Sequence, residues 1–522
     1  MSVKWLTLRC RRVDADPLIH FAKQGRLLAK ITLGNLAWQQ SLIRIAYPTC
    51  NTLLMGITLL INSAHAIGLP DLLEDPLKTK PPILNFGPLL PDGQPIVCPS
   101  EVNLSQALAL SEAIDLALCN NPQIKQAWAA IKIQAGALGE ARSAYLPTSS
   151  ATYSPQQTQL NYPTSTYNAN SITNGQMSYV NFNWRLFDFG GRSANRISAN
   201  LLLESALASH NAALQKTMAS VIQSYFDVLT ARATVNAKEQ ATQHAQLSWQ
   251  ATLRREAKGV SAKSDALQAQ TALAKAELDD ARARGDYRKA LASLVFIMGL
   301  PPSNSNLTVQ ELSERASAQN FKDLASWLTE AEEEHPAIKA AKAQWESAKE
   351  RVTSARAAGL PTIDFVGNFY QNGYPNQGLQ PVKSNTTTVG LALTIPFFEG
   401  FATTYKIRGA QAQAEKVQAD LEDTTNQILT EIIKSHSDAV SSLTNLQSSQ
   451  KLLEAANAAV NSSVNRYDKG VADILELLTT QTALVQAQQE RIRCIAEWHS
   501  ARLRLLANAG VLGKQPVGQE GQ

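Results

Sequence analysis

The side chains that could perform chemistry are few, and their spacing does not match a known catalytic or metal-binding arrangement. Seven histidines are scattered over 522 residues, and none forms an HExxH pair. The chain has no GxxxxGK phosphate-binding loop and no GxSxG nucleophile turn. Gly190-Gly191 precedes a helical stretch but lacks the third glycine of a dinucleotide-binding turn. We therefore predict that the protein is not an enzyme and holds neither a cofactor nor a metal.

The basic excess of the chain lies at its N-terminus. The net charge is +4, from 48 basic and 44 acidic residues. Eight of the basic and two of the acidic residues precede position 67, which leaves 40 basic and 42 acidic residues in the remainder. Nucleic-acid binding depends on an electrostatic attraction to phosphates that this remainder lacks. We therefore expect no nucleic-acid partner.

Residues 1–66 are interpreted as a leader with a secretory signal peptide. Arg44 supplies positive charge, residues 53–61 (LLMGITLLI) form an apolar run, and Ala64-His65-Ala66 fits a cleavage site. The run is too short to span a bilayer, which takes about 20 residues. A buried helix or a short anchor is the alternative. The proline-rich segment 67–101 is expected to be extended, without a core of its own.

Three cysteines follow this leader. In an oxidising compartment, Cys98 and Cys119 could form a disulfide that ties the proline-rich segment to the first helix. Two independent thiols are the alternative. Cys494 lies in a helical pattern, and we expect it to be buried as a small apolar residue.

The strongest feature of the sequence is an internal repeat. Four short segments recur in the same order, two at an offset of 214 residues and two at an offset of 211. Such agreement is hard to obtain by chance. The pairs are Asn121-Pro122-Gln123-Ile124 with His335-Pro336-Ala337-Ile338, Ala141 to Pro147 with Ala355 to Pro361, Lys258-Gly259-Val260 with Lys469-Gly470-Val471, and Gln270 to Leu273 with Gln481 to Leu484.

Each half has the same order of elements. A helix rich in Ala, Gln and Lys runs to a Leu-Pro pair, where proline disfavours helix in the preceding residue. Two strands follow, and a very long helix then resumes, over 192–255 in the first half. The predicted ranges are helices at 104–145 and 323–359, and strands near 149–160, 177–189, 362–374 and 386–398.

The repeat also predicts the division of the chain into domains. The first repeat is expected over 102–302 and the second over 323–512. A linker over 303–322 joins them, and a polar tail over 513–522 follows.

The predicted strands alternate between apolar and polar residues. Val389, Leu391 and Leu393 alternate with Gly390 and Ala392, and residues 179–186 follow the same rule. Strands of this kind are typical of a barrel in a lipid bilayer, and a water-soluble sheet with one wet face is the alternative. The long helix favours the barrel, because about 64 residues extend roughly 95 Å.

Four strands cannot close a barrel, since the smallest natural barrels use about eight. Open sheet edges are not tolerated in lipid. The pattern therefore predicts that several copies of the chain share one barrel.

The order of elements resembles the TolC family of outer-membrane efflux proteins, over about 102–512. The Asn121-Pro122 and His335-Pro336 helix starts carry this resemblance, together with the Leu-Pro exits and the Lys-Gly-Val turns. The strand exits Phe187-Asp188-Phe189-Gly190-Gly191 and Pro396-Phe397-Phe398-Glu399-Gly400 belong to it too.

The resemblance implies a mainly α protein with a membrane β-barrel. A homotrimer would form a twelve-stranded barrel, four strands from each chain, continued by an α-helical tunnel across the periplasm. Loops around 158–175 and 375–385 would face outside the cell. The implied partners are outer-membrane lipid, a periplasmic adaptor, and an inner-membrane transporter of the ABC or another type.

The resemblance also implies site residues. The Lys-Gly-Val turns would form the adaptor-docking tips: Lys258, Gly259, Val260, Lys469, Gly470 and Val471. Tyr467, which precedes one turn, would belong to the channel entrance, and Glu476 would narrow that entrance. Thr479 stands where some relatives have a second acidic residue, and Asp473 could join the closing contacts. The junction of barrel and tunnel would involve Pro147, Gly190, Gly191, Pro361, Pro396 and Gly400.

Two further interpretations concern the exported cargo and the competing architecture. The region from Cys98 to Trp128 resembles outer-membrane components of type I protein secretion of the cyclolysin or haemolysin kind, and small-molecule efflux is the alternative. A periplasmic coiled-coil adaptor or scaffold would share the long helices. It would not need alternating strands in both halves.

Overall fold

The computed structural model describes most of the two repeats. Of a first compact unit, Met1–Pro76, it describes only the end, and the second unit, Leu77–Gln522, contains every element below. The predicted signal peptide and leader, the polar tail, the middle of the predicted outer loop 158–175 and most of that at 375–385 lie outside the described residues. The residues that the structure describes are 75–78, 87–90, 93–96, 98, 107–160, 171–302, 307–310, 322–372 and 384–511.

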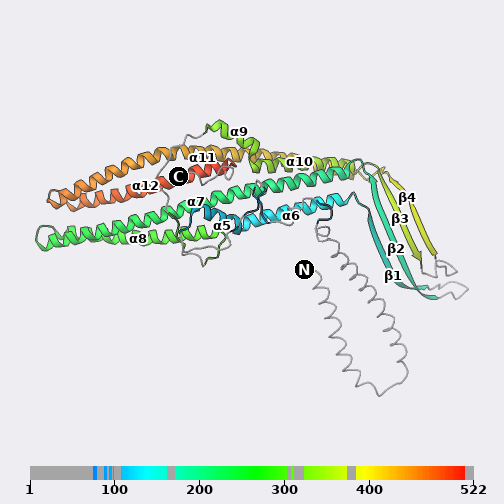
Figure 1. Cartoon of the computed structure of the whole chain (residues 1–522), viewed down its shortest axis with the longest axis horizontal. Coiled ribbons are helices and arrows are strands. Elements are labelled where there is room, and N and C mark those ends of the chain that lie inside the picture. The colour runs from blue at the N-terminus through cyan, green and yellow to red at the C-terminus, as the bar shows by residue number, and fades with distance from the viewer. Residues whose placement is uncertain are drawn as a thin grey trace, which may run out of the picture. The chain divides into compact units, whose positions relative to one another are not determined.

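The helices occur in pairs of equal length, one from each half of the chain (Figure 1). The shortest pair has 11 residues, the next 22, the third 67 and the last 35. The repeat in the sequence is therefore a repeat of every helix. The pairs are α5 (Leu110–Asn120) with α9 (Leu324–Glu334), α6 (Pro122–Ser143) with α10 (Pro336–Ala357), α7 (Gly191–Ala257) with α11 (Ala402–Asp468), and α8 (Lys263–Ile297) with α12 (Ile474–Asn508).

The single helices predicted over 104–145 and 323–359 are each divided in two. Asn121 and His335 separate the parts with extended backbone, at φ −60° and −64°. Each is followed by proline, which excludes helical backbone from the residue before it and is itself suited to the first helical position. The Asn121 side chain accepts a hydrogen bond from the backbone N–H of Gln123, and that of His335 accepts one from Ala337.

The strands form one antiparallel sheet in the order β1-β2-β3-β4. Compared with the prediction, β2 begins earlier and β4 ends sooner, because Pro396 has no N–H to continue the ladder. β1 alternates weakly in sequence but pairs with β2 along its whole length, from Thr148 opposite Asn183 to Leu160 opposite Ser171. The bounds are β1 Thr148–Leu160, β2 Ser171–Phe187, β3 Thr362–Asn372 and β4 Ser384–Thr394.

The two faces of the sheet differ in polarity, as the alternation predicts. Residues opposite one another in adjacent strands share a face. One face carries the cross-strand rows Phe182–Gly367–Val389 and Trp184–Phe365–Leu391. The other carries Asn181–Asn368–Thr388, where the Asn181 amide and the Tyr179 hydroxyl both donate to the Asn368 side-chain oxygen at 2.9 Å.

Helix α7 is the central element of the described helices. It packs against α6 and α8 from its own half, and against α10 and α12 from the other half. The core cluster on it joins Val221, Ile222, Tyr225 and Phe226 to apolar residues of α5 and α8. Among the described residues, no helix is both long and apolar enough to cross a membrane.

Part of the predicted linker 303–322 is fixed against α7. Leu108 and Val309 form an isolated parallel bridge. The buried Tyr225 hydroxyl lies 2.9 Å from the carbonyl oxygen of Leu108 and 3.0 Å from that of Gln310. Burial raises the pKa of Tyr225 to about 12, so the hydroxyl stays protonated and can donate to these carbonyls.

Candidate functional site

The two predicted docking tips are short turns of the same geometry. Gly259 and Gly470 have φ +71° and +74°, the left-handed backbone that favours glycine after a helix. The valine after each glycine donates its backbone N–H to a carbonyl oxygen five residues earlier, at 2.9 Å in both halves. Lys258 and Lys469 are the C-caps of α7 and α11. The Val260 and Val471 side chains are 66% and 70% exposed.

Tyr467 is held at the second tip by an arginine from α7. The Arg255 guanidinium lies 4.6 Å from the centre of the buried tyrosine ring, and its Nη1 donates to the Tyr467 carbonyl oxygen at 2.8 Å. The tyrosine hydroxyl is 3.4 Å from the hydroxyl of Thr252. This contact joins the ends of the two long helices, which belong to different halves of the chain.

Apart from Tyr467 in α11, the predicted entrance residues lie at the start of α12. Asp473 is its N-cap and accepts a hydrogen bond from the Glu476 backbone N–H at 2.8 Å. The Glu476 carboxylate lies 3.4 Å from a guanidinium nitrogen of Arg466. Thr479 is exposed, and its hydroxyl donates to the Leu475 carbonyl oxygen at 2.7 Å. The structure thus gives Asp473 a capping contact and Glu476 a cationic neighbour.

Sequence reasoning missed both arginines of the tips, although a signal for them was present. Arg255 and Arg466 stand 211 residues apart, which is the offset that relates the two Lys-Gly-Val turns. Each precedes its glycine by four residues. The same position in the two halves therefore places a cation beside each turn, and each makes a different contact.

The predicted junction between strands and tunnel contains two successive left-handed residues in each half. These are Phe189 and Gly190 before α7, at φ +51° and +89°, and Gly400 and Phe401 before α11, at +60° and +64°. Two such residues turn the chain sharply from strand to helix. Pro147 and Pro361 immediately precede β1 and β3, and Pro396 follows β4. A Cβ atom on Gly191 would lie 3.3 Å from the Cβ of Ala357, so α7 and α10 approach closely there.

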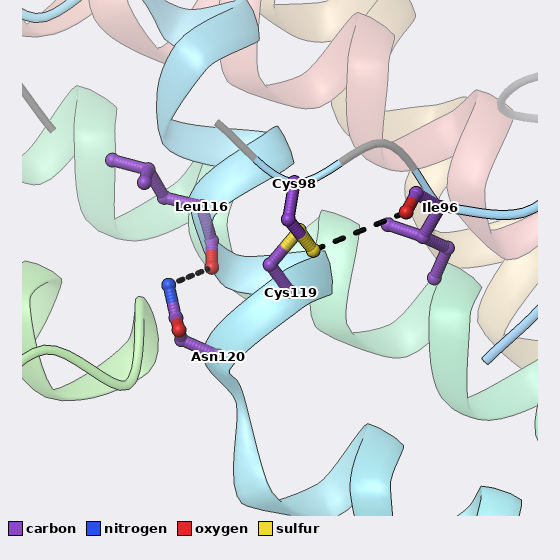
Figure 2. The surroundings of a disulfide bond; sticks show 5 residues. All are labelled: Ile96, Cys98, Leu116, Cys119 and Asn120. Carbon is purple, nitrogen blue, oxygen red and sulfur yellow. Dashed lines mark hydrogen bonds between the residues drawn. A yellow bond between two sulfur atoms is a disulfide. The ribbon is translucent and has the colours of Figure 1, made fainter. Parts of the chain in front are cut away.

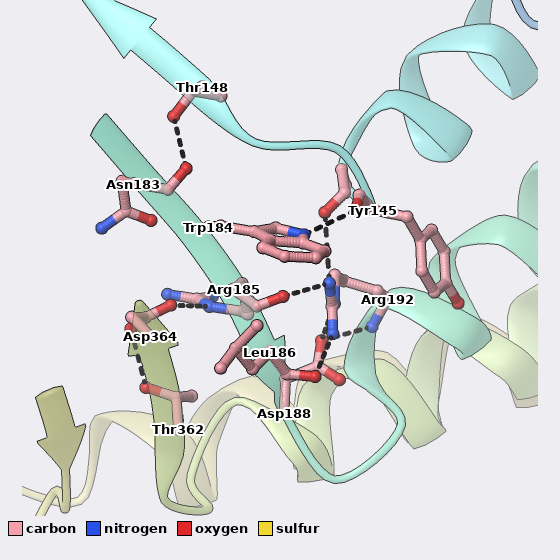
Figure 3. Close-up of polar contacts among 11 residues, drawn as sticks. Tyr145, Thr148, Asn183, Trp184, Arg185, Leu186, Asp188, Arg192, Thr362 and Asp364 are labelled. Carbon is pink, nitrogen blue, oxygen red and sulfur yellow. Dashed lines mark hydrogen bonds and ion pairs between the residues drawn. The ribbon is translucent and has the colours of Figure 1, made fainter. Parts of the chain in front are cut away.

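Arg192 ties three elements together at the first junction (Figure 3). Its guanidinium donates to the carbonyl oxygens of Arg185 at 2.7 Å and Leu186 at 3.1 Å, at the end of β2. It also donates to that of Ala144 at 3.4 Å, just after α6. Its Nε pairs with the Asp188 carboxylate at 3.1 Å, and the side chain is largely buried. The second half has Thr403 at this position, and its hydroxyl donates to Glu399 at 2.5 Å.

A charged pair joins the two halves within the sheet. Arg185 on β2 donates to the buried carboxylate of Asp364 on β3 at 2.9 Å (Figure 3). These are the only charged residues of the four strands. They are opposite one another in the ladder and share the polar face with Asn181 and Asn368. One basic and one acidic residue in otherwise uncharged strands are the feature of the sequence from which this ion pair could have been predicted.

Cys98 and Cys119 are joined by a disulfide, with their Cα atoms 5.6 Å apart (Figure 2). It ties a described residue of the proline-rich segment to the end of α5. Cys494 has a free, buried thiol in a cluster with Leu446 and Trp498. Burial raises its pKa. Among the residues that the structure describes, no group of His, Cys, Asp and Glu could hold a metal ion.

Solved structures share this fold. The outer membrane protein VceC from Vibrio cholerae superposes with a TM-score of 0.67, covering 77% of this chain and 96% of that one, at 18% sequence identity. Identity at this level supports the fold alone.

Curated relatives extend the similarity to the sequence. Protein CyaE of Bordetella pertussis is 34% identical over 428 residues, covering 80% of this chain and 88% of the relative. The alkaline protease secretion protein AprF of Pseudomonas aeruginosa is 24% identical, covering 78% and 85%.

The family described as outer membrane efflux protein matches residues 113–300 and 327–511, which correspond to the two halves of the repeat. These matches cover well over half of the chain and include both hairpin tips and all four strands. The chain therefore belongs to the outer membrane efflux protein family, whose members are channel proteins of the outer membrane and not enzymes.

Proposed function

We propose that this protein is the outer-membrane channel of a type I protein secretion system. One observation carries the channel: a four-stranded sheet with one apolar and one polar face continues directly into two hairpins of very long helices. The similarity to AprF, a protein named for the secretion of a protease, supports protein as the cargo. The energy would come from an inner-membrane transporter, since the channel is a passive conduit.

In this proposal, the sheets of three copies together form one closed barrel. β1 and β4 are the outer strands of the sheet and each has one unpaired edge. Unpaired backbone groups are not tolerated in lipid, where water cannot satisfy them. Three chains would supply twelve strands, with the apolar face toward outer-membrane lipid and the polar face toward the lumen.

The hairpin tips would dock onto a periplasmic adaptor in this proposal. Val260 and Val471 expose apolar side chains beside Lys258 and Lys469, on turns held rigid by their backbone hydrogen bonds. A rigid apolar contact flanked by charge is suited to binding another protein. Glu476, one turn into α12, would be repeated three times around the entrance and attract cations.

The proposal is tested first on the full chain expressed in a Gram-negative host. We expect a detergent-requiring species in the outer-membrane fraction, which migrates at trimer mass when unheated and at monomer mass after heating. A water-soluble periplasmic species would overturn the channel and favour an adaptor or scaffold.

The cargo is tested by deleting the gene in its native host. We expect the loss of one or more proteins from the culture medium, restored by the intact gene. The tip variant Val260→Asp/Val471→Asp should not restore secretion although it still forms the trimer. The control Gln268→Asp, which adds a charge to α8 outside the turn, should restore it. Unchanged secretion with increased sensitivity to small toxic compounds would replace protein cargo by small-molecule efflux.

A further inference from the structure

The first thirty residues of α11 lack the cover that their counterparts in α7 have. Residues 402–431 contain no buried side chain, and the first one is Ile432. Its counterpart in α7, 211 positions earlier, is the buried Val221. Before Val221, the corresponding stretch 191–220 buries a series of residues: Ala194, Ser198, Leu203, Ser205, His210, Leu214, Gln215 and Thr217.

The missing cover is identified by the repeat. α7 packs against α6, from its own half, and against α10, from the other half. α11 packs against α10, the partner from its own half. By the repeat, the partner of α11 from the other half would be α6, which is the counterpart of α10. The α6 of the same chain does not pack against α11. The α6 that covers α11 therefore belongs to a second copy of the chain.

The exposed face of α6 agrees with this assignment. Ser347 and Ala357 of α10 are buried, and their counterparts in α6, 214 positions earlier, are the exposed Ile133 and Ser143. Ile133 is 68% exposed. The same helix position is therefore buried in one half, at Ser347, and exposed in the other, at Ile133. This difference indicates that a second copy covers Ile133.

The unpaired sheet edges agree as well. Within the chain, Phe182 of β2 lies opposite Gly367 of β3. In the repeat, Leu393 of β4 is the counterpart of Phe182, 211 positions later, and Tyr153 of β1 is the counterpart of Gly367, 214 positions earlier. The repeat therefore places Leu393 opposite Tyr153 from a second copy. Both are exposed, and both lie on the apolar face of the sheet. A shift of one residue would put them on different faces, so the register from the repeat is consistent.

We propose that Ile133 of one copy packs against Gly409 of the next. This contact between copies would be equivalent in position to a serine pair that joins the two halves within each chain. Within the chain, the buried hydroxyls of Ser198 on α7 and Ser347 on α10 lie 2.9 Å apart. Their counterparts are Gly409 on α11 and Ile133 on α6. A Cβ atom on Gly409 would meet nothing within 4 Å, so this helix face has room for the isoleucine. The interface within the chain thus pairs two small serines, and the proposed interface between copies pairs an isoleucine with a glycine.

This inference rests on the proposed function, because it names the contact by which copies form the channel wall. It is tested with the full chain in the outer membrane, in the double variant Ile133→Cys/Gly409→Cys. Since the serine hydroxyls are in contact at the equivalent place, cysteines there can form a disulfide after backbone adjustment. We expect oxidation to give covalent dimers and trimers on a denaturing, non-reducing gel, which reductant removes.

Three controls accompany the double variant. Lys132→Cys/Gly409→Cys moves one cysteine to a neighbouring exposed position and should give little cross-linking. Ser198→Cys/Ser347→Cys should give a link within one chain and no covalent oligomer. Each single variant should stay monomeric on the denaturing gel, because the two faces differ and the contact is heterologous. Cross-linking of a single variant would show a two-fold contact and overturn the proposal.

The packing is tested separately by exchanging side chains. Gly409→Leu should weaken the unheated trimer, and adding Ile133→Ala should restore much of it. Ile133→Ser/Gly409→Ser recreates the serine pair and should keep the trimer. If the wild type is a trimer in the outer membrane but Ile133→Cys/Gly409→Cys does not cross-link, this pairing is wrong and the channel function stands. If the wild type is not in the outer membrane, the proposed function fails first.

Discussion

Asn121 both begins α6 and binds the end of α8. Its side-chain oxygen caps α6, and its Nδ2 donates to the carbonyl oxygen of Ile297, the last residue of α8, at 2.9 Å. In the second half His335 caps α10 and is hydrogen-bonded to the backbone of Asn508, the last residue of α12. Each half is thus closed by one buried polar side chain that joins a helix start to a helix end.

Asn121→Ala should destabilise the protein by about 2 kcal/mol. The change removes a helix cap, worth about 1 kcal/mol, and leaves the Ile297 carbonyl without its side-chain donor. Thermal unfolding of the purified protein, followed by circular dichroism, measures the effect. Gln123→Ala, at an exposed position two residues further on, is the matched control and should change little. Equal melting temperatures for the two variants would contradict this account.

Gly299→Ala should be far more damaging than Gly259→Ala. Both glycines are left-handed, at φ +70° and +71°, so alanine costs about 1 kcal/mol at each from backbone strain alone. A Cβ on Gly299 would also lie 2.7 Å from the carbonyl group of Asn120, while one on Gly259 would meet nothing within 4 Å. We expect a total loss of about 3 kcal/mol for Gly299→Ala. Denaturant unfolding of both variants tests the difference, and similar midpoints would show that the helix ends can separate without cost.

The parts of this fold that sequence could predict are those set by local backbone chemistry and by repetition. The Lys-Gly-Val turns were visible because glycine supplies left-handed backbone after a helix, and the repeat doubled that signal. The division at Asn121-Pro122 differs from the continuous helix predicted over 104–145, because the residue before a proline resists helical backbone. β1 was weak in sequence because its pairing with β2, and not its own alternation, makes it a strand.

The contacts that sequence could not predict join residues far apart in the chain. Arg192 reaches Ala144, and Arg255 reaches Tyr467, only because the helices carrying them are brought side by side. Arginine is common on helix surfaces. The repeat offset singles out Arg255 as a position but does not indicate which residue it contacts, and Arg192 has no arginine counterpart, since Thr403 stands at its position. The position of a carbonyl oxygen that accepts their hydrogen bonds is a property of the folded backbone alone.

His335→Asn should remove part of the acid sensitivity of the protein. Burial lowers the pKa of His335 to about 4, from an ordinary value of 6.5. The pKa of His335 is therefore lower in the folded state than in the unfolded state. Its contribution to the free energy of unfolding is fully present above pH 6.5 and is lost as the pH falls toward 4. The difference between the two pKa values limits this contribution to at most about 3 kcal/mol.

The matched comparison for His335 comes from the molecule itself. Asparagine is the residue at this position in the first half, where it caps α6, and it does not titrate. We expect the melting temperature of His335→Asn to decline less than that of the wild type between pH 6.5 and 4. The buried His210, whose pKa burial also lowers, remains in both proteins and cancels in the comparison. Parallel pH profiles would show that His335 is not the sensitive group.

Cys98→Ser should lower the thermal stability of the protein while leaving the proposed trimer intact. The disulfide closes a loop with a sequence separation of 21 residues, and the restriction of the unfolded chain is worth about 3 kcal/mol. Cys494→Ser, which removes the free thiol, is the control. Alkylation before and after reduction counts the accessible thiols in the unfolded wild type. If reductant changes neither the alkylation nor the melting temperature, the bond is absent from the protein.

Glu476 and Arg466 should have opposite effects on the ion selectivity of the channel. Their charged groups lie 3.4 Å apart at the second tip, and in a trimer each pair would be repeated around the axis. Both side chains are substantially exposed, so we expect little effect on folding from either change. Glu476→Ala removes the anionic member and should weaken cation preference in planar-bilayer recordings. Arg466→Ala leaves three unopposed carboxylates and should strengthen it, and raised salt should reduce both shifts by screening. If neither variant alters the reversal potential, the selective ring lies elsewhere along the tunnel.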